Sequence, residues 1–153
     1  MNKVSISILD CDFDNLEFEI NRINESNSDY IHIDIMDGVF VERDTRNLFD
    51  LNTIKKLSKI PLDIHLMVNN PLSIIDQYAK YNPSFITIHF ENNPDIKDCL
   101  KLIKSHNINA GIAINPDTEI SILKPYLKDV ELILVMSVFP GKGGQKFINT
   151  TYN

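Results

Sequence analysis

The chain contains six short, apolar, strand-like segments that alternate with amphipathic, helix-like stretches. The strand-like segments begin near Val4, Tyr30, Leu62, Phe85, Asn109 and Leu132. The stretches between them repeat apolar residues at helical spacing, and several have a start signal, such as Asp50 or the Asn70-Pro71 pair. Strands that alternate with helices are typical of right-handed parallel crossovers. The sequence therefore predicts an α/β fold of about six parallel strands with helices outside.

Two details of this fold concern predicted helices. We expect a short helix over residues 119–127 that directs Ile120, Leu123 and Leu127 inward. Cys99 belongs to a helical apolar pattern and is expected to be a buried thiol. Cys11 lies far from it in the sequence, so the two cysteines indicate neither a zinc knuckle nor a redox motif.

Composition limits the classes of protein and partner. The 153 residues, 43% hydrophobic and 24% charged, indicate a single domain spanning residues 1–153. A net charge of -6 with scattered lysines and arginines argues against a nucleic-acid partner. No run approaches the roughly 18 apolar residues of a membrane span, and the N-terminus has no signal-peptide pattern. We therefore expect a cytoplasmic protein without a membrane or nucleic-acid partner.

Two of the strands alternate apolar residues with residues that can do chemistry. In residues 30–36 (YIHIDIM) the alternation places His32 and Asp34 on one face, and in residues 62–67 (LDIHLM) it gives His65 a similar place. Such groups are unfavourable inside an apolar strand unless a partner satisfies them, and a divalent metal is the usual partner of a His/Asp/His set. The pattern predicts a metal site at these three residues.

Other polar and sulfur-containing side chains fall at the ends of the predicted strands. Parallel α/β sheets bind ligands at the carboxyl ends of their strands. Alternation places these residues there: Ser7, Asp34, Met36, His65, Met67, His89, Asn115 and Met136. A single strand methionine is usually core filler, but repetition at equivalent positions favours a site. For His89, a hydrogen-bonded core histidine and a site residue are equally good interpretations.

A glycine-rich segment, PGKGGQ at residues 140–145, follows the last predicted strand. Glycines allow the backbone to approach a phosphate and direct N–H groups at it, which an acidic chain needs locally. Gly141, Gly143 and Gly144 are the candidates, and Lys142 either assists or is solvated. The alternative is a flexible loop without a ligand.

Taken together, these motifs resemble the ribulose-phosphate 3-epimerase family along the whole chain. The resemblance rests on Ser7-Ile8-Leu9 with Asp12-Phe13, on HIDIMDG at 32–38, on DIHLM at 63–67, on MSV at 136–138 and on the glycine segment. It implies a (β/α)8 barrel of the ribulose-phosphate-binding (TIM) type. It also implies an isomerase of the pentose phosphate pathway that converts D-ribulose 5-phosphate to D-xylulose 5-phosphate.

The resemblance also implies roles for individual residues. A divalent metal, typically zinc, with iron, manganese or cobalt as alternatives, is held by His32, Asp34, His65 and a further aspartate, and stabilises the enediolate formed on deprotonation. Asp34 is the base on one face of the sugar, and a second carboxylic acid acts on the other. Ser7 and His65 contact the substrate, the glycine segment with Lys142 lies beside its phosphate, and Met36, Met67 and Met136 wall the intermediate.

The sequence departs from the family in two places. It stops at Asn153, whereas family members continue through two more β-α units that contain the second aspartate, and neither Asp63 nor Asp44 is expected to replace it. We therefore expect an incomplete, C-terminally truncated barrel with low activity, whose open strand edges favour a homo-oligomer or other association. The charged segment 42–47 suggests a related substrate such as a hexulose 6-phosphate.

Three further alternatives remain. The chain is a fragment of a longer gene, or it is an inactive phosphosugar-binding or interaction protein. A barrel decarboxylase or synthase is less favoured, because those sites use a strand lysine and none is present here.

Overall fold

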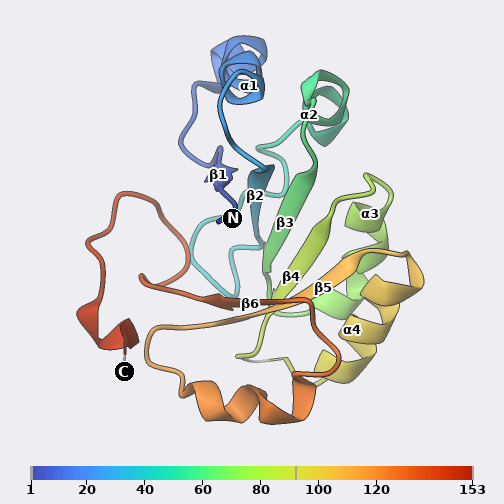
Figure 1. Ribbon diagram of the computed structural model, residues 1–153, viewed down its shortest axis with the longest axis vertical. Coiled ribbons are helices and arrows are strands. Elements are labelled where there is room, and N and C mark those ends of the chain that lie inside the picture. The colour runs from blue at the N-terminus through green and yellow to red at the C-terminus, as the bar shows by residue number, and fades with distance from the viewer. Residues whose placement is uncertain (1, 92, 153) are drawn as a thin grey trace.

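The computed structural model describes residues 2–91 and 93–152. Its centre is a six-stranded sheet in which every neighbouring pair of strands is parallel and the order follows the chain, as Figure 1 shows. The strands are β1 (Ser5–Ser7), β2 (Tyr30–Met36), β3 (Leu62–Met67), β4 (Phe85–His89), β5 (Asn109–Ile114) and β6 (Leu132–Val135). The sheet curls into a half-barrel, so the predicted incomplete (β/α) barrel of six parallel strands is confirmed.

Helical segments follow the strands and lie outside the sheet (Figure 1). The α-helices are α1 (Leu16–Asn24), α2 (Leu51–Leu57), α3 (Ile75–Ala79) and α4 (Ile96–Ser105). The 3-10 helices are η1 (Phe13–Asn15), η2 (Pro71–Ser73), η3 (Ile120–Tyr126) and η4 (Asn149–Tyr152). A Pro at the first position of η2 matches the expected start signal.

Local sequence explains where several helices begin and which face they bury. Asp50 caps α2, because its Oδ1 accepts a hydrogen bond from the backbone N–H of Thr53 at 3.1 Å. Helix α4 buries the residues that repeat at helical spacing: Ile96, Cys99, Leu100 and Ile103. The expectation of a buried Cys99 thiol is thus confirmed, and burial raises the pKa of that thiol to about 11.

The expectation for residues 119–127 was wrong in its details. This segment is the 3-10 helix η3, which buries Leu123 but leaves Ile120 and Leu127 more than half exposed. Pro125 has no N–H to donate, which favours a short irregular helix over an α-helix. With three residues per turn, Leu127 no longer shares the face of Leu123.

The packing of β2 and β3 sets the position of the site. Ile31, Ile33 and Ile35 are at most 1% exposed and belong to the hydrophobic core. The opposite face of β2 is aligned with β3 in three layers: His32 beside Asp63, Asp34 beside His65, and Met36 beside Met67. Each layer brings side chains of adjacent strands close together on the inner face of the half-barrel.

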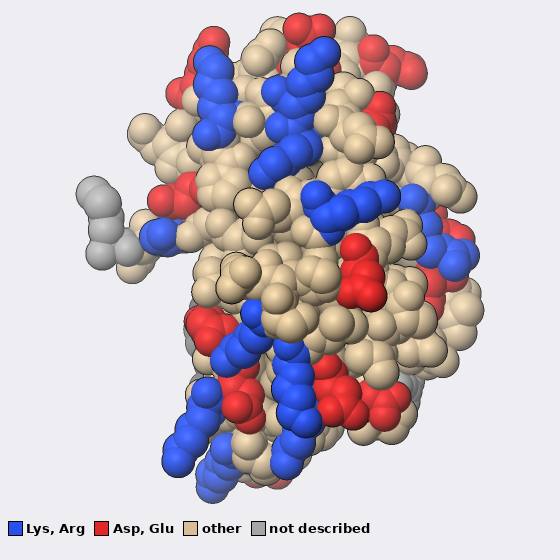
Figure 2. All heavy atoms as spheres, turned by 90° about the vertical axis from the view of Figure 1, so that its right-hand side faces the viewer, with Lys and Arg blue, Asp and Glu red and all other residues tan. Residues whose placement is uncertain are grey.

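The outer surface mixes both signs of charge. On the face that includes α3 and α4, lysine and arginine side chains are interspersed with aspartate and glutamate (Figure 2). Among the helices in the described part of the chain, none has the length and apolarity needed to cross a membrane.

Candidate metal and substrate site

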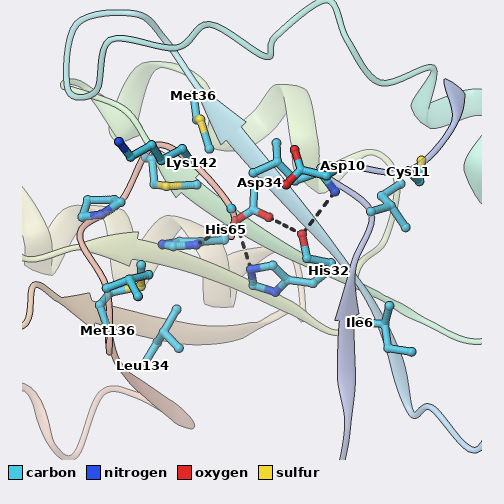
Figure 3. Close-up of a pocket in the computed structure, with 18 of the residues that line it drawn as sticks. Ile6, Asp10, Cys11, His32, Asp34, Met36, His65, Leu134, Met136 and Lys142 are labelled. Carbon is cyan, nitrogen blue, oxygen red and sulfur yellow. Dashed lines mark hydrogen bonds and ion pairs between the residues drawn. The ribbon is translucent and has the colours of Figure 1, made fainter. Parts of the chain in front are cut away.

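The three predicted metal ligands converge at the inner face of the half-barrel. Asp34 Oδ1 lies 3.3 Å from His32 Nε2 and 3.3 Å from His65 Nδ1. One ligand atom from each residue lies within 4.8 Å of the others, and Figure 3 shows the three side chains pointing toward one another. Strands β2 and β3 therefore bring together two imidazoles and a carboxylate.

His32 is oriented by a carboxylate on the next strand. Its Nδ1 lies 2.8 Å from Asp63 Oδ2, which also accepts a hydrogen bond from Ser5 Oγ at 2.8 Å. An ionised carboxylate only accepts hydrogen bonds, so Nδ1 of His32 bears the proton and Nε2 faces Asp34. We expected no site role for Asp63. Alternation puts it on the same face as His65, but its contact with His32 depends on the register of β2 and β3, which the sequence does not indicate.

His65 is held from its other side by His89. The two Nε2 atoms are 2.9 Å apart, and His89 Nδ1 lies 3.1 Å from Glu91 Oε2. His89 is 2% exposed, so it is both buried and in contact with the predicted site. Sequence reasoning left His89 open and did not consider Glu91 at all.

Burial and hydrogen bonding give the ionisable groups distinct states. Burial would raise the pKa of Asp34, but the hydrogen bond and the positive charge of His32 outweigh it and hold that pKa well below its usual range. Burial would lower the pKa of His32, but Asp34 and Asp63 together raise it to about 10. For His65, burial dominates and lowers the pKa to about 4.

This donor set fits a divalent cation. Two imidazole nitrogens and an ionised carboxylate are ligands that zinc and neighbouring transition metals accept. The second nitrogen of each imidazole is engaged, His32 with Asp63 and His65 with His89, which is the usual arrangement around metal-binding histidines. Asp34 Oδ1 and His65 Nδ1 also face each other, and a positive charge bound by both atoms would stabilise this arrangement.

A pocket of about 640 Å³ opens over these residues. It is lined by most of the other predicted site residues: Ser7, Met36, Met67, Met136, Gly141, Lys142 and Gly143. Figure 3 shows Met36, Met136 and Lys142 around the His/Asp cluster. Ser7 Oγ donates a 2.6 Å hydrogen bond to Asp34 Oδ2. Gly144 and Asn115 are not among the residues that line this pocket.

The glycine-rich segment lies tightly against neighbouring chain. A Cβ added at Gly143 would lie 2.2 Å from Asp10 Oδ2, so a larger residue there would require the exposed Asp10 carboxylate to move. Gly141 has a φ of +119°, and an added Cβ would be 3.3 Å from Val41 Cβ. Gln145 Nε2 donates to the carbonyls of Phe139 and Lys142 and fixes the turn.

Both arginines of the charged segment 42–47 form ion pairs. Arg43 Nη1 lies 3.3 Å from Asp10 Oδ1, and its Nη2 donates to the carbonyl of Leu9 at 3.4 Å. Arg46 pairs with Asp44. Arg43 thereby connects the segment after β2 to the segment after β1.

Fold and site together define an α/β-barrel protein with a candidate metal centre at the carboxyl ends of its strands. Residues 3–153 match the model of the ribulose-phosphate 3 epimerase family. The chain is 43% identical over 147 residues to the ribulose-phosphate 3-epimerase of Helicobacter pylori, covering 96% of this chain and 67% of that protein. It is 37% identical over 150 residues to that of Bacillus subtilis, covering 98% and 69%. For that of Synechocystis the identity is 40% over 147 residues, covering 95% and 64%. The chain therefore belongs to the ribulose-phosphate 3-epimerase family, and it spans about two thirds of the length of these relatives.

Proposed function

We propose that the site epimerises a ketose phosphate at its third carbon in a metal-dependent reaction, converting D-ribulose 5-phosphate to D-xylulose 5-phosphate. The observation that supports this most directly is the convergence of His32, Asp34 and His65 within 4.8 Å in a chain of this family. The proposal includes the pentose phosphate pathway as context and the cytoplasm as location.

The proposed metal ligands are His32, Asp34 and His65, with zinc as the cation and iron, manganese or cobalt as alternatives. A divalent cation at this place supplies positive charge that favours loss of a proton next to a carbonyl. The support is the donor chemistry and the hydrogen bonds that fix each imidazole.

Asp34 is the proposed base. Its carboxylate takes the proton from the third carbon, and the electron pair of the broken C–H bond forms the double bond of an enediolate. A second acid on the opposite face, which the described His/Asp cluster does not include, would then give up a proton to the same carbon and so form the inverted sugar. The low pKa of Asp34 keeps the group ionised, and Ser7 Oγ fixes the position of its Oδ2. Ser7 and His65 are the proposed contacts to the sugar.

The remaining residues that line the pocket are proposed to bind the phosphate group or to surround the reacting carbons. Gly141, Lys142, Gly143 and Gly144 would bind the phosphate through backbone N–H groups and one ammonium. Their place at the pocket, apart from that of Gly144, supports this assignment. Met36, Met67 and Met136 would surround the reacting carbons without competing for protons.

A second candidate is binding of a sugar phosphate without turnover. Turnover with inversion needs an acid and a base on opposite faces of the sugar. The carboxylates that line the pocket among the described residues are Asp10, Glu19 and Asp34. Asp10 is paired with Arg43 and Glu19 with Arg22, so only Asp34 belongs to the His/Asp cluster, which favours binding alone. A hexulose 6-phosphate is a third candidate substrate, favoured by the charged segment beside the pocket.

The test follows the proton at the third carbon. The chain is incubated in D2O with zinc and D-ribulose 5-phosphate, and NMR measures deuterium uptake and D-xylulose 5-phosphate formation. We expect both, and we expect Asp34→Asn to reduce both at least about a thousandfold. Asp129→Asn, an exposed site at the other end of the sheet, is the matched control and should behave as the unmodified chain.

Each outcome distinguishes the candidates. Deuterium uptake without xylulose 5-phosphate would show that only one face of the sugar exchanges protons, and binding without uptake would favour the second candidate. Faster turnover of a hexulose 6-phosphate would favour the third. His65→Ala should lose bound zinc as measured by elemental analysis, and full retention of zinc would contradict the ligand assignment.

A further inference from the structure

The ring of His65 belongs to a buried chain of hydrogen bonds that leads away from the pocket. His65 Nε2 lies 2.9 Å from His89 Nε2, and His89 Nδ1 lies 3.1 Å from Glu91 Oε2. The side chains of both histidines are 1% exposed, and their rings are inclined by 21° with centroids 4.9 Å apart, as an in-plane contact between the two Nε2 atoms requires. Water therefore has little access to the ring nitrogens of these two histidines, and each nitrogen has to form its hydrogen bond with a neighbouring protein group.

Glu91 determines where the protons of the chain lie. Its Oε1 accepts hydrogen bonds from the backbone N–H of Asn115 at 2.8 Å and from Thr118 Oγ1, while Oε2 faces His89. These contacts and His89 outweigh burial and lower the pKa of Glu91 to about 2. An ionised carboxylate can only accept, so Nδ1 of His89 donates.

The proton on His89 Nδ1 settles the tautomer of its neighbour. Because Nδ1 is the nitrogen of His89 that donates, Nε2 is the one that accepts, so the 2.9 Å contact requires His65 Nε2 to donate. His65 consequently has its lone pair on Nδ1, which faces Asp34 Oδ1.

The opposite arrangement of protons is less favourable. It would place a lone pair of His89 Nδ1 against the Glu91 carboxylate at 3.1 Å. In return, His65 Nδ1 would donate a hydrogen bond to Asp34 Oδ1 at 3.3 Å. The oxygens of Asp34 already interact with His32 and Ser7, so this hydrogen bond adds little.

We infer that His89 and Glu91 are positioning residues for the cation site, which keep the proton of His65 on Nε2 and present its Nδ1 lone pair to the ion. Phe40 packs on the ring of His89 with the ring centroids 4.8 Å apart, and the backbone N–H of Asn115 holds Glu91 at the end of β5. The positions of both His89 and Glu91 are therefore fixed by their neighbours. The inference rests on the proposed metal site and adds residues from β4 and the segment after it.

Glu91→Gln is the most discriminating variant, because it keeps shape and removes one acceptor. The glutamine has one oxygen where Glu91 has two, so its NH2 group faces either the Asn115 N–H or His89 Nδ1. If the NH2 group faces His89 Nδ1, that nitrogen has to accept, so the proton of His89 lies on Nε2. His65 Nε2 then accepts from His89, and the proton of His65 moves to Nδ1, the nitrogen that would face the ion. We expect the Kd for Co2+, measured by visible absorption, to rise about 10- to 100-fold.

Glu131→Gln is the matched control. Glu131 Oε2 accepts a 2.9 Å hydrogen bond from the backbone N–H of Ala110, at the opposite end of β5, and Glu131 pairs with Lys104. This variant loses a carboxylate bound to the same strand but has no contact with the histidine chain. Its Kd for Co2+ should stay within about twofold of that of the unmodified chain, well below the 10- to 100-fold rise expected for Glu91→Gln.

A second pair of variants tests His89 itself. Glutamine at this position can accept from His65 Nε2 and donate to Glu91, as the proposed tautomer does, whereas leucine can do neither. His89→Gln should therefore bind Co2+ much more tightly than His89→Leu. Equal affinity of both variants and the unmodified chain would overturn the inference.

A measurement without metal separates this inference from the proposed function. Long-range 1H–15N NMR spectra of the histidine rings should show His65 protonated at Nε2 in the chelator-treated chain and at Nδ1 in Glu91→Gln. A proton on Nδ1 in the unmodified chain would refute the inference even if Co2+ binds. Absence of Co2+ binding with the expected tautomers would refute the metal site and leave the positioning of His65 intact.

Discussion

Asp63→Asn tests how the structure supports His32. Asp63 Oδ2 lies 2.8 Å from His32 Nδ1, and the side chain of His32 is 17% exposed between this carboxylate and Asp34. Asparagine keeps the size of the side chain and removes its charge. The variant therefore isolates the electrostatic contribution of Asp63.

The magnitude follows from the pKa of His32. Its increase from 6.5 to about 10 corresponds to about 5 kcal/mol in favour of the imidazolium in the folded state. Asp34 and Asp63 share this contribution, so removal of one charge should cost about 2 kcal/mol, within the range for hydrogen bonds to charged groups. Because the folded pKa is raised, this stabilisation is fully present below pH 6.5 and disappears as the pH rises through about 10.

Urea unfolding at two pH values measures this. At pH 6 the midpoint of Asp63→Asn should fall by about 1 M urea relative to the unmodified chain, and above pH 10 the difference should largely vanish. Asp76→Asn is the matched control, since Asp76 Oδ1 pairs with His106 Nε2 at 2.7 Å on the exposed surface. It should change stability by less than about 0.5 kcal/mol at either pH. A loss in Asp63→Asn that is equal at both pH values would refute the assignment of the effect to the His32 charge.

Three further perturbations test the surroundings of the site. A Cβ at Gly111 would lie 2.4 Å from Thr87 Oγ1, so Gly111→Ala should cost about 1 to 3 kcal/mol in urea unfolding, and less in a Thr87→Ala background. Thr45 is fully buried, its Oγ1 donating to the carbonyl of Asp34 and accepting from the N–H of Met36, so Thr45→Val should cost about 2 kcal/mol in thermal unfolding. The sheet ends at strands β1 and β6, and Ile133 and Val135 are 36% and 39% exposed, so we expect concentration-dependent association in sedimentation experiments. Lysine at both positions should reduce it, and a monomer at every concentration of the unmodified chain would contradict this expectation.

The parts of the molecule that sequence could predict are those that depend on local periodicity. Alternation with a period of two residues is enough to put Ile31, Ile33 and Ile35 in the core and His32 and Asp34 on the other face. Parallel strands end at one edge, which is why the methionines at the carboxyl ends of different strands line one pocket.

The parts that sequence could not predict depend on register between strands and on turns. Asp63 became a partner of His32 only because β2 and β3 are aligned with these two residues side by side. Glu91 lies outside any strand, and the groups that fix it beside His89 come from the segment after β5, so no pattern within its own segment indicates its role. The helix expected at 119–127 is present as a 3-10 helix that buries Leu123, but its three-residue period moves Leu127 off the face of Leu123.

The opposite states of the two histidines lead to a quantitative prediction for cation binding. In the chelator-treated protein at pH 8, the pKa of about 10 keeps His32 protonated, whereas that of about 4 keeps His65 neutral. A cation can use His32 Nε2 only after that nitrogen has lost its proton, so binding should release about one proton per ion and tighten about tenfold per pH unit below pH 10. Titration calorimetry in buffers of different ionisation enthalpy measures the number of protons released. Release of no proton at pH 8 would mean that His32 is already neutral, or that the ion does not use it. The pH dependence of Co2+ affinity separates these outcomes, because an ion that uses His32 would bind about tenfold more tightly per pH unit below the pKa of that ring, whereas an ion that does not use it would show no such dependence.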